Sequence, residues 1–243
     1  MKNFFKTEIE SIKKTFKNFD RKVFIIFVSV AVLQTISWYF TSRDFFRENF
    51  YYNYFKAEAS ADLYEFLYWF GSDFITLFII PLVIIKFLLK EKINGYGLKF
   101  GDYKTGLKYF IIFSICILTF TFFLSQIPEF ANNYPFLKSA KYDWKTFIIF
   151  ETAALVYMIA WEFIWRGFML FGLEEKFGMN AILIQMLSFV ILHNGKPFIE
   201  TLSAIIGAIL LGYIAIRTRS IFYGVAIHFI LFFSMDLFVV LMK

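Results

Sequence analysis

Four ionisable side chains lie within apolar stretches of the C-terminal half of this chain. Glu162 and Arg166 are four residues apart, which places them on one face of a helix, one turn apart. His193 ends an apolar run and His228 lies in the last apolar segment, and these are the only two histidines in the chain. A carboxylate, a guanidinium and two imidazoles are groups that can activate water and stabilise a developing negative charge.

The depths of these groups indicate that they converge. With a rise of about 1.5 Å per residue, we expect Glu162 roughly 16 Å, His193 roughly 20 Å and His228 roughly 10 Å inside the membrane. An ionised residue at the centre of a membrane helix costs about 2.5–3.5 kcal/mol, so it usually faces a partner or a water-filled cavity. Taken alone, Glu162 and Arg166 would be interpreted as a buried ion pair, and each histidine as a packing residue. Their coincidence in one slab favours a functional site.

Five further ionisable residues are secondary candidates. Lys196 and Glu200 are four residues apart and either support the site or pair at the membrane edge. Glu151 lies three helical turns before the ion pair, where it extends the polar face or is solvated at the interface. Asp73 and Asp236 fall inside apolar helices, where each lines the cavity or hydrogen-bonds a neighbouring helix.

The composition indicates that hydrocarbon is the solvent of these helices. Of 243 residues, 59% are hydrophobic and 18% charged, whereas soluble domains average about 45–50% apolar residues. The net charge of +6 is expected to reflect Lys and Arg in cytoplasmic loops rather than nucleic-acid binding. The single cysteine, Cys116, excludes an intramolecular disulfide and a cysteine metal cluster.

We therefore expect an all-α fold, a polytopic transmembrane helical bundle of about seven spans with an N-terminal amphipathic surface helix. The first span is expected to remain as a signal anchor. The expected spans lie near residues 23–41, 64–89, 107–126, 146–173, 180–193, 201–216 and 221–242.

Basic loops indicate the orientation. The loops near residues 86–108 and 217–219 are basic, so we expect them and the N-terminus to be cytoplasmic. The loops near 42–62 and 127–145 then lie outside. The expected location is the bacterial inner (cytoplasmic) membrane, with the protein integral to it.

The chain divides into three regions. Residues 1–22 are expected to form an amphipathic cytoplasmic helix, because apolar residues recur at helical spacing and most other positions are basic. The alternative is a soluble helix that docks on the rest of the protein. Residues 23–145 are the N-terminal transmembrane helices, and residues 146–242 are the core helices that carry the candidate site.

The C-terminal motifs resemble the CPBP family of CAAX proteases and bacteriocin-processing enzymes, which includes type II CAAX prenyl endopeptidases. That family carries Glu-Glu-x-x-x-Arg on one helix, Phe-x-x-x-His on the next, and a later His followed four residues on by Asn or Asp. Glu162 and Arg166 match the second Glu and the Arg, Phe189 and His193 match the second motif, and His228 matches the later His. The resemblance covers about residues 146–238.

Two positions depart from the family pattern. Trp161 stands where the family has its first Glu, and Phe232 stands where it has Asn or Asp. In the family, the first Glu is thought to activate water together with the His of the second motif. The last His and the Asn are thought to stabilise the oxyanion.

The resemblance implies an intramembrane endopeptidase that hydrolyses a peptide bond of a membrane-associated or lipid-modified peptide or protein by activating water. Glu162 is the expected base, with Glu200 as the alternative base. Arg166 would anchor Glu162, His193 would orient the water and His228 would face the carbonyl oxygen.

The expected partners are a peptide or protein substrate within the membrane and the lipid bilayer, without nucleic acid. No cofactor is expected, since the chain has no His-Glu-x-x-His motif and the resemblance favours metal-free chemistry. Zinc stays possible in principle, because two His and a Glu can bind it.

Two other functions stay open. Trp161 and Phe232 favour a non-catalytic protein of the same fold, which would act as a bacteriocin-immunity or scaffold factor. A small transporter is disfavoured, because the sequence has no repeated halves and no pair of Gly- or Pro-broken helices in corresponding positions.

Overall fold

The computed structural model describes residues 1–56 and 60–242, without the side chains of residues 2 and 3. Within these residues the regular structure is entirely helical, and six helical stretches are long and apolar enough to cross a membrane. A further apolar helix, α10 (Asn180–Ile191), is shorter. The predicted fold class, a polytopic helical bundle, is therefore confirmed, and the protein is an integral membrane protein.

The other helices follow one another along the chain with short connections. Their bounds are α1 (Lys2–Lys17), α2 (Arg21–Phe40), α3 (Arg43–Phe46), α4 (Ala61–Phe74), α5 (Ile80–Val83), α6 (Tyr103–Leu124), α7 (Pro128–Asn133), α8 (Trp144–Glu162), α9 (Gly172–Phe177), α11 (Phe198–Thr218) and α12 (Phe222–Leu241).

π-Helical turns continue several of these helices. Residues Arg47–Phe55 prolong α3, and residues Phe163–Phe171 join α8 to α9, so that Trp144–Phe177 is one helical stretch. The sequence predicted a loop near 42–62, but helix resumes at α3, where the Ser42 hydroxyl accepts a hydrogen bond from the Phe45 amide. Residues 57–59 of that loop lie outside the described part of the chain.

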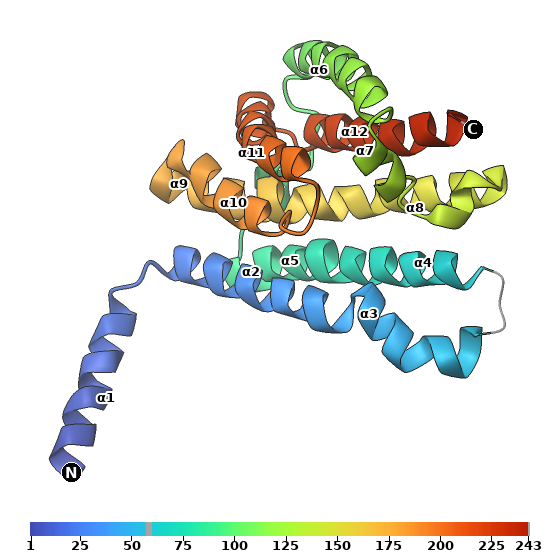
Figure 1. Ribbon diagram of the computed structural model, residues 1–243. Coiled ribbons are helices and arrows are strands. Elements are labelled where there is room, and N and C mark those ends of the chain that lie inside the picture. Colours follow the sequence, from blue (N-terminus) through green and yellow to red (C-terminus); the bar gives the residue numbers. More distant parts are fainter. Residues whose placement is uncertain (57–59, 243) are drawn as a thin grey trace.

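The helix α8 lies at the centre of the bundle. α2 and the α4–α5 stretch run side by side on one flank of α8, and α6, α11 and α12 lie on the other (Figure 1). α12 packs against both α6 and α8, and α10 packs against α11. Because α8 and α10–α12 adjoin one another, side chains from three regions of the sequence can meet between them.

A polar side chain fastens the short helix α10 to α11. Gln185 Nε2 donates to the carbonyl of Ala208 over 2.9 Å, and Gln185 is fully buried. Gly212 lets α11 approach α10 closely, since a Cβ atom at residue 212 would lie 3.1 Å from the Gln185 side-chain amide nitrogen. Interhelical hydrogen bonds and small residues are the usual means of helix association in a membrane. They hold α10 against α11, and the first candidate histidine, His193, follows the C-terminal end of α10.

The N-terminal helix α1 extends away from the bundle, steeply inclined to α2 (Figure 1). Its apolar side chains are exposed, with Phe5 at 62%, Ile9 at 51% and Phe16 at 57%. Basic side chains occupy other positions of the helix. The structure thus has the amphipathic helix expected from the sequence, and its contact with a lipid surface stays a prediction.

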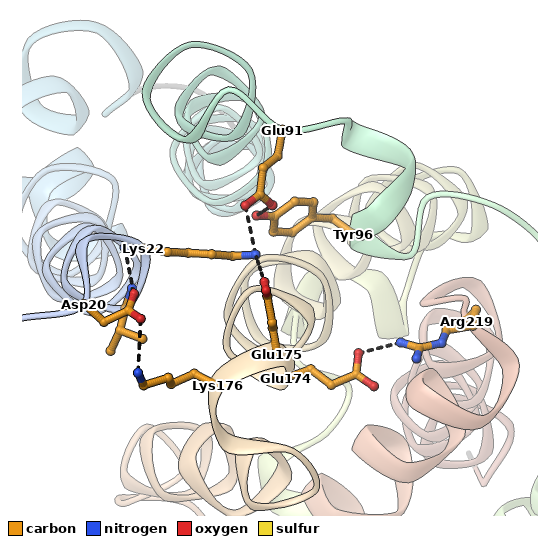
Figure 2. A network of polar contacts seen from close by, with 9 residues as sticks. Asp20, Lys22, Glu91, Tyr96, Glu174, Glu175, Lys176 and Arg219 are labelled. Carbon is orange, nitrogen blue, oxygen red and sulfur yellow. Dashed lines mark hydrogen bonds and ion pairs between the residues drawn. The ribbon is translucent and has the colours of Figure 1, made fainter.

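A network of ion pairs joins the helix ends on the side of the bundle from which α2 starts. Figure 2 shows Lys22 of α2 between Glu91 and Glu175, with nitrogen–oxygen distances of 2.9 Å and 3.4 Å. The Tyr96 hydroxyl donates to Glu91 over 2.7 Å, and Arg219 binds Glu174. The network therefore connects the N-terminal flank to α9 and to the end of α11.

We expect Lys22→Met to lower the melting temperature of the purified protein in detergent by about 1–4 °C, because two partly exposed ion pairs are lost. Lys13→Met on α1 is the matched control and should leave it unchanged. Equal melting temperatures for Lys22→Met and the unaltered protein would contradict a stabilising role of this network.

Candidate active site

Glu162 and Arg166 form an ion pair that the bundle encloses completely. Arg166 Nη1 donates to Glu162 Oε1 over 3.0 Å, and both side chains have 0% exposure. Glu162 ends α8, and the π-helical stretch begins at the next residue. Such wide turns are frequent at functional sites. Removing one partner of a buried pair costs about 3–5 kcal/mol, so each charge depends on the other.

The same carboxylate oxygen contacts His228 of α12. His228 Nδ1 lies 2.7 Å from Glu162 Oε1. Gly224, one turn before His228, makes this approach possible, because a Cβ atom there would lie 3.1 Å from Glu162 Oε2. The sequence placed both groups in one slab of the membrane, and the structure brings them into direct contact.

Hydrogen-bond partners assign the protons of both histidines. An ionised carboxylate and a backbone carbonyl accept hydrogen bonds and donate none. His228 Nδ1 therefore donates to Glu162, and His193 Nδ1 donates to the carbonyl of Phe189 over 2.8 Å. In the neutral imidazole the Nε2 atom of each ring then carries the free lone pair.

The ring of Phe189 connects these groups. The Arg166 guanidinium carbon lies 4.2 Å from its centroid, which is a cation–π contact. The ring centroids of His193 and His228 lie 4.4 Å and 6.0 Å from that of Phe189. Three of the four groups of the predicted cluster therefore gather around one aromatic side chain, and the fourth, Glu162, binds two of them.

His193 and His228 line one cavity of about 300 Å³. Its wall is mainly apolar and comes from α6, α11 and α12, together with the end of α10. The His228 side chain is 15% exposed, whereas Glu162 is fully enclosed. A water molecule in this cavity can therefore contact the imidazoles, and it reaches the carboxylate through His228.

Three polar residues line the same cavity near His193. Lys196 Nζ lies 2.5 Å from Glu200 Oε1, and the Tyr134 hydroxyl donates to Glu200 Oε2 over 3.1 Å. Burial raises the pKa of the Tyr134 hydroxyl well above its usual range, so it remains a hydrogen-bond donor. Tyr134 was missed by the sequence analysis, because it lies in a connecting segment 66 residues from Glu200 and belongs to no motif.

The remaining secondary candidates do not line the cavity that His193 and His228 share. Asp236 accepts hydrogen bonds from the Phe136 amide at 3.0 Å and 3.1 Å, which anchors the segment that carries Tyr134. Glu151 of α8 is buried beside Asp236. Asp73 of α4 lines a second cavity.

Both positions that depart from the family pattern carry packed aromatic rings. The Trp161 centroid lies 6.0 Å from that of Phe189 and 5.8 Å from that of Trp165. Phe232 lines the histidine cavity and packs on Phe136 at 5.8 Å. The cavity is therefore more apolar at residue 232 than the family pattern implies.

Among the described residues, no group of three or more His, Cys, Asp or Glu side chains is arranged to hold a metal ion. The expectation that the site needs no cofactor stays a prediction.

We expect Gly224→Ala to lower the free energy of unfolding by about 1–3 kcal/mol, because the added methyl group would press on the enclosed Glu162 carboxylate. Gly71→Ala on α4 is the matched control, since a Cβ atom there meets nothing within 4 Å. Thermal unfolding in detergent measures both, and an equal stability of the two variants would contradict the close approach.

Residues 143–233 match a protein-family model described as type II CAAX prenyl endopeptidase Rce1-like. The matched segment contains the ion pair and both histidines, and it leaves out α2 and α4. No curated protein matches the chain, and no solved structure matches it. The match confirms the resemblance predicted from the motifs. The chain is a polytopic membrane protein, and its residues 143–233 relate it to the CAAX-type endopeptidases of the Rce1-like family.

Proposed function

We propose that this protein is an intramembrane endopeptidase that hydrolyses a peptide bond of a membrane-associated or lipid-modified peptide. The observation that carries the proposal is the pair of histidines in one cavity. Each has its Nδ1 atom engaged, so each has Nε2 available to water. The family match of residues 143–233 supports this reaction class.

In the proposed mechanism His228 is the general base. Its Nε2 takes a proton from water as the water oxygen attacks the scissile carbonyl, and Glu162 stabilises the imidazolium through Nδ1. From the sequence alone, Glu162 itself is the expected base. Its enclosure and its bond to Arg166 favour an orienting role instead. The imidazolium of His228 later gives the proton to the leaving amine.

His193 is the second acceptor for the same water. With one proton of the water directed to each Nε2 atom, the oxygen lone pair is free to face the carbonyl carbon. Lys196 lines the same cavity and provides positive charge for the oxyanion. In the family pattern an Asn or Asp has this place, and Phe232 replaces it here. The proposed scheme uses these side chains and water.

The shape of the cavity supports a substrate with apolar parts. Side chains of α6 and α11 such as Phe113, Phe120 and Leu210 line it, and the polar residues Lys196 and Glu200 lie near His193. An acyl or prenyl chain or an apolar peptide segment would be held by the apolar wall. Its peptide bond would then lie at the polar end.

The proposal is tested with the purified full chain in proteoliposomes. One substrate is a single-span peptide, and the other is a peptide ending in a prenylated cysteine followed by three residues. Mass spectrometry of the products identifies the bond that is cleaved. Cleavage of either substrate by the unaltered protein supports the proposal, and the prenylated substrate separates a lipid-dependent from a general activity.

We expect His228→Ala and Glu162→Gln each to lower the rate constant of cleavage by about 10²–10⁴-fold, since one removes the base and the other its orienting carboxylate. Glu129→Gln, on the exposed part of α7, is the control and should cleave normally. Imidazole added to the buffer should partly restore His228→Ala, which a purely structural role would not explain. A wild-type rate for His228→Ala would contradict the mechanism.

A second function follows from the two aromatic positions. Trp161 and Phe232 replace polar residues of the family pattern with packed rings, which favours a non-catalytic protein that binds a peptide in the same cavity. Such a protein would serve as a bacteriocin-immunity or scaffold factor. A Glu162→Gln variant that protects cells as well as the unaltered protein, with no cleavage by either, would establish this alternative.

A further inference from the structure

A second cavity, of about 610 Å³, lies between α2, α4 and α8. Trp161 and Leu192 line it, whereas Phe189 and His193 line the histidine cavity. The rings of Trp161 and Phe189, 6.0 Å apart, are therefore part of the wall between the two cavities. The second cavity is thus separate from the site of the proposed hydrolysis.

A buried carboxylate lines the second cavity. Asp73 is 1% exposed, and it accepts hydrogen bonds from Thr41 and from Trp69 Nε1, the latter over 2.8 Å. Among the described residues, Asp73 forms no ion pair. Hydrogen bonds from neutral donors do not balance a negative charge, so an ionised Asp73 requires a cation beside it.

Aromatic rings line the same cavity as this carboxylate. They come from three helices, and the residues are Trp38, Trp69, Tyr157 and Trp161. The face of an indole or phenol ring attracts a cation through its quadrupole, and tryptophan does so most strongly. A carboxylate in a cavity lined by such rings can bind an organic ammonium group.

The charged residues that line the cavity also favour a cation. Arg43 and Arg47 both bind Glu65, and Arg47 binds Asp44 as well, so both guanidiniums already have partners. Among the residues that line the cavity, two arginines therefore stand against three acids, which are Asp44, Glu48 and Asp73. An anionic ligand would meet this excess of acidic groups, and a neutral ligand would not balance an ionised Asp73.

We propose that this cavity binds an organic ammonium group, with Asp73 as the counter-charge and the tryptophan faces around it. The ammonium group belongs to a free solute such as choline or to a lipid headgroup. Trp38 and Tyr39 line the cavity and are 67% and 64% exposed, so their rings can contact a free solute or a lipid headgroup.

The test uses the purified full chain in a maltoside detergent, because zwitterionic detergents carry an ammonium group themselves. Choline is titrated while tryptophan fluorescence is recorded, since three of the five tryptophans line the cavity. The neutral isostere 3,3-dimethyl-1-butanol is titrated in parallel. We expect a saturable change with choline and none with the isostere.

Asp73→Asn should raise the dissociation constant of choline by about tenfold or more, because the amide keeps the shape but removes the charge. Glu151→Gln is the matched control, a buried carboxylate outside this cavity, and should bind choline normally. Equal responses to choline and its isostere, or unchanged choline binding by Asp73→Asn, would overturn the proposal. The comparison with the isostere keeps the test valid if Asp73→Asn fails to fold.

A second arm distinguishes the sources of the ammonium group. The protein is placed in nanodiscs of phosphatidylglycerol, in which choline should bind, and then in nanodiscs that also contain phosphatidylethanolamine or phosphatidylcholine. Loss of choline binding in the mixed nanodiscs assigns the site to a lipid headgroup, and retained binding assigns it to a free solute. Absence of choline binding in both would overturn the proposal.

Discussion

A carboxylate enclosed in a membrane bundle must have its charge balanced by neighbours that are fixed in space. Glu162 meets this constraint with Arg166 on its own helix and His228 on α12. The guanidinium in turn lies over the Phe189 ring, which also contacts both histidines. Since low local dielectric strengthens paired charges and penalises unpaired ones, the position of each group depends on the others. The geometry of this site and the protonation states of its groups therefore depend on each other.

The rest of the fold keeps that cluster in place. α8 has to run through the centre of the bundle so that Glu162 is enclosed from every side. Gly224 lacks a side chain that would keep α12 away from the Glu162 carboxylate. Gln185 fastens the short helix α10 through a backbone carbonyl of α11. The ion pairs of Lys22 connect the N-terminal flank to α9. These contacts are far apart in the sequence, and those of Gly224 and Gln185 fix α12 and α10, the helices that position His228 and His193.

The sequence was sufficient to predict the helical bundle and the convergence of Glu162, Arg166, His193 and His228, because apolar period and helical rise together set depth in a membrane. Depth alone cannot tell which atom faces a cavity. The enclosure of Glu162 depends on the close approach of α12, and Tyr134 reaches the cavity from a segment without a motif. Trp161 stands out in the sequence as a departure from the family pattern. Its place between two cavities, however, follows only from the packing of α8 against α2, α4 and α10.

The central claim is that Glu162 holds His228 with its proton on Nδ1, which leaves Nε2 as the base. The chain has only two histidines, so ¹⁵N-histidine labelling gives two imidazoles to assign, with His193→Gln separating them. For His228 at neutral pH we expect a protonated Nδ1 and an unprotonated Nε2, with this preference weakened in Glu162→Gln. A proton on Nε2 of His228, or a spectrum unaffected by Glu162→Gln, would contradict it.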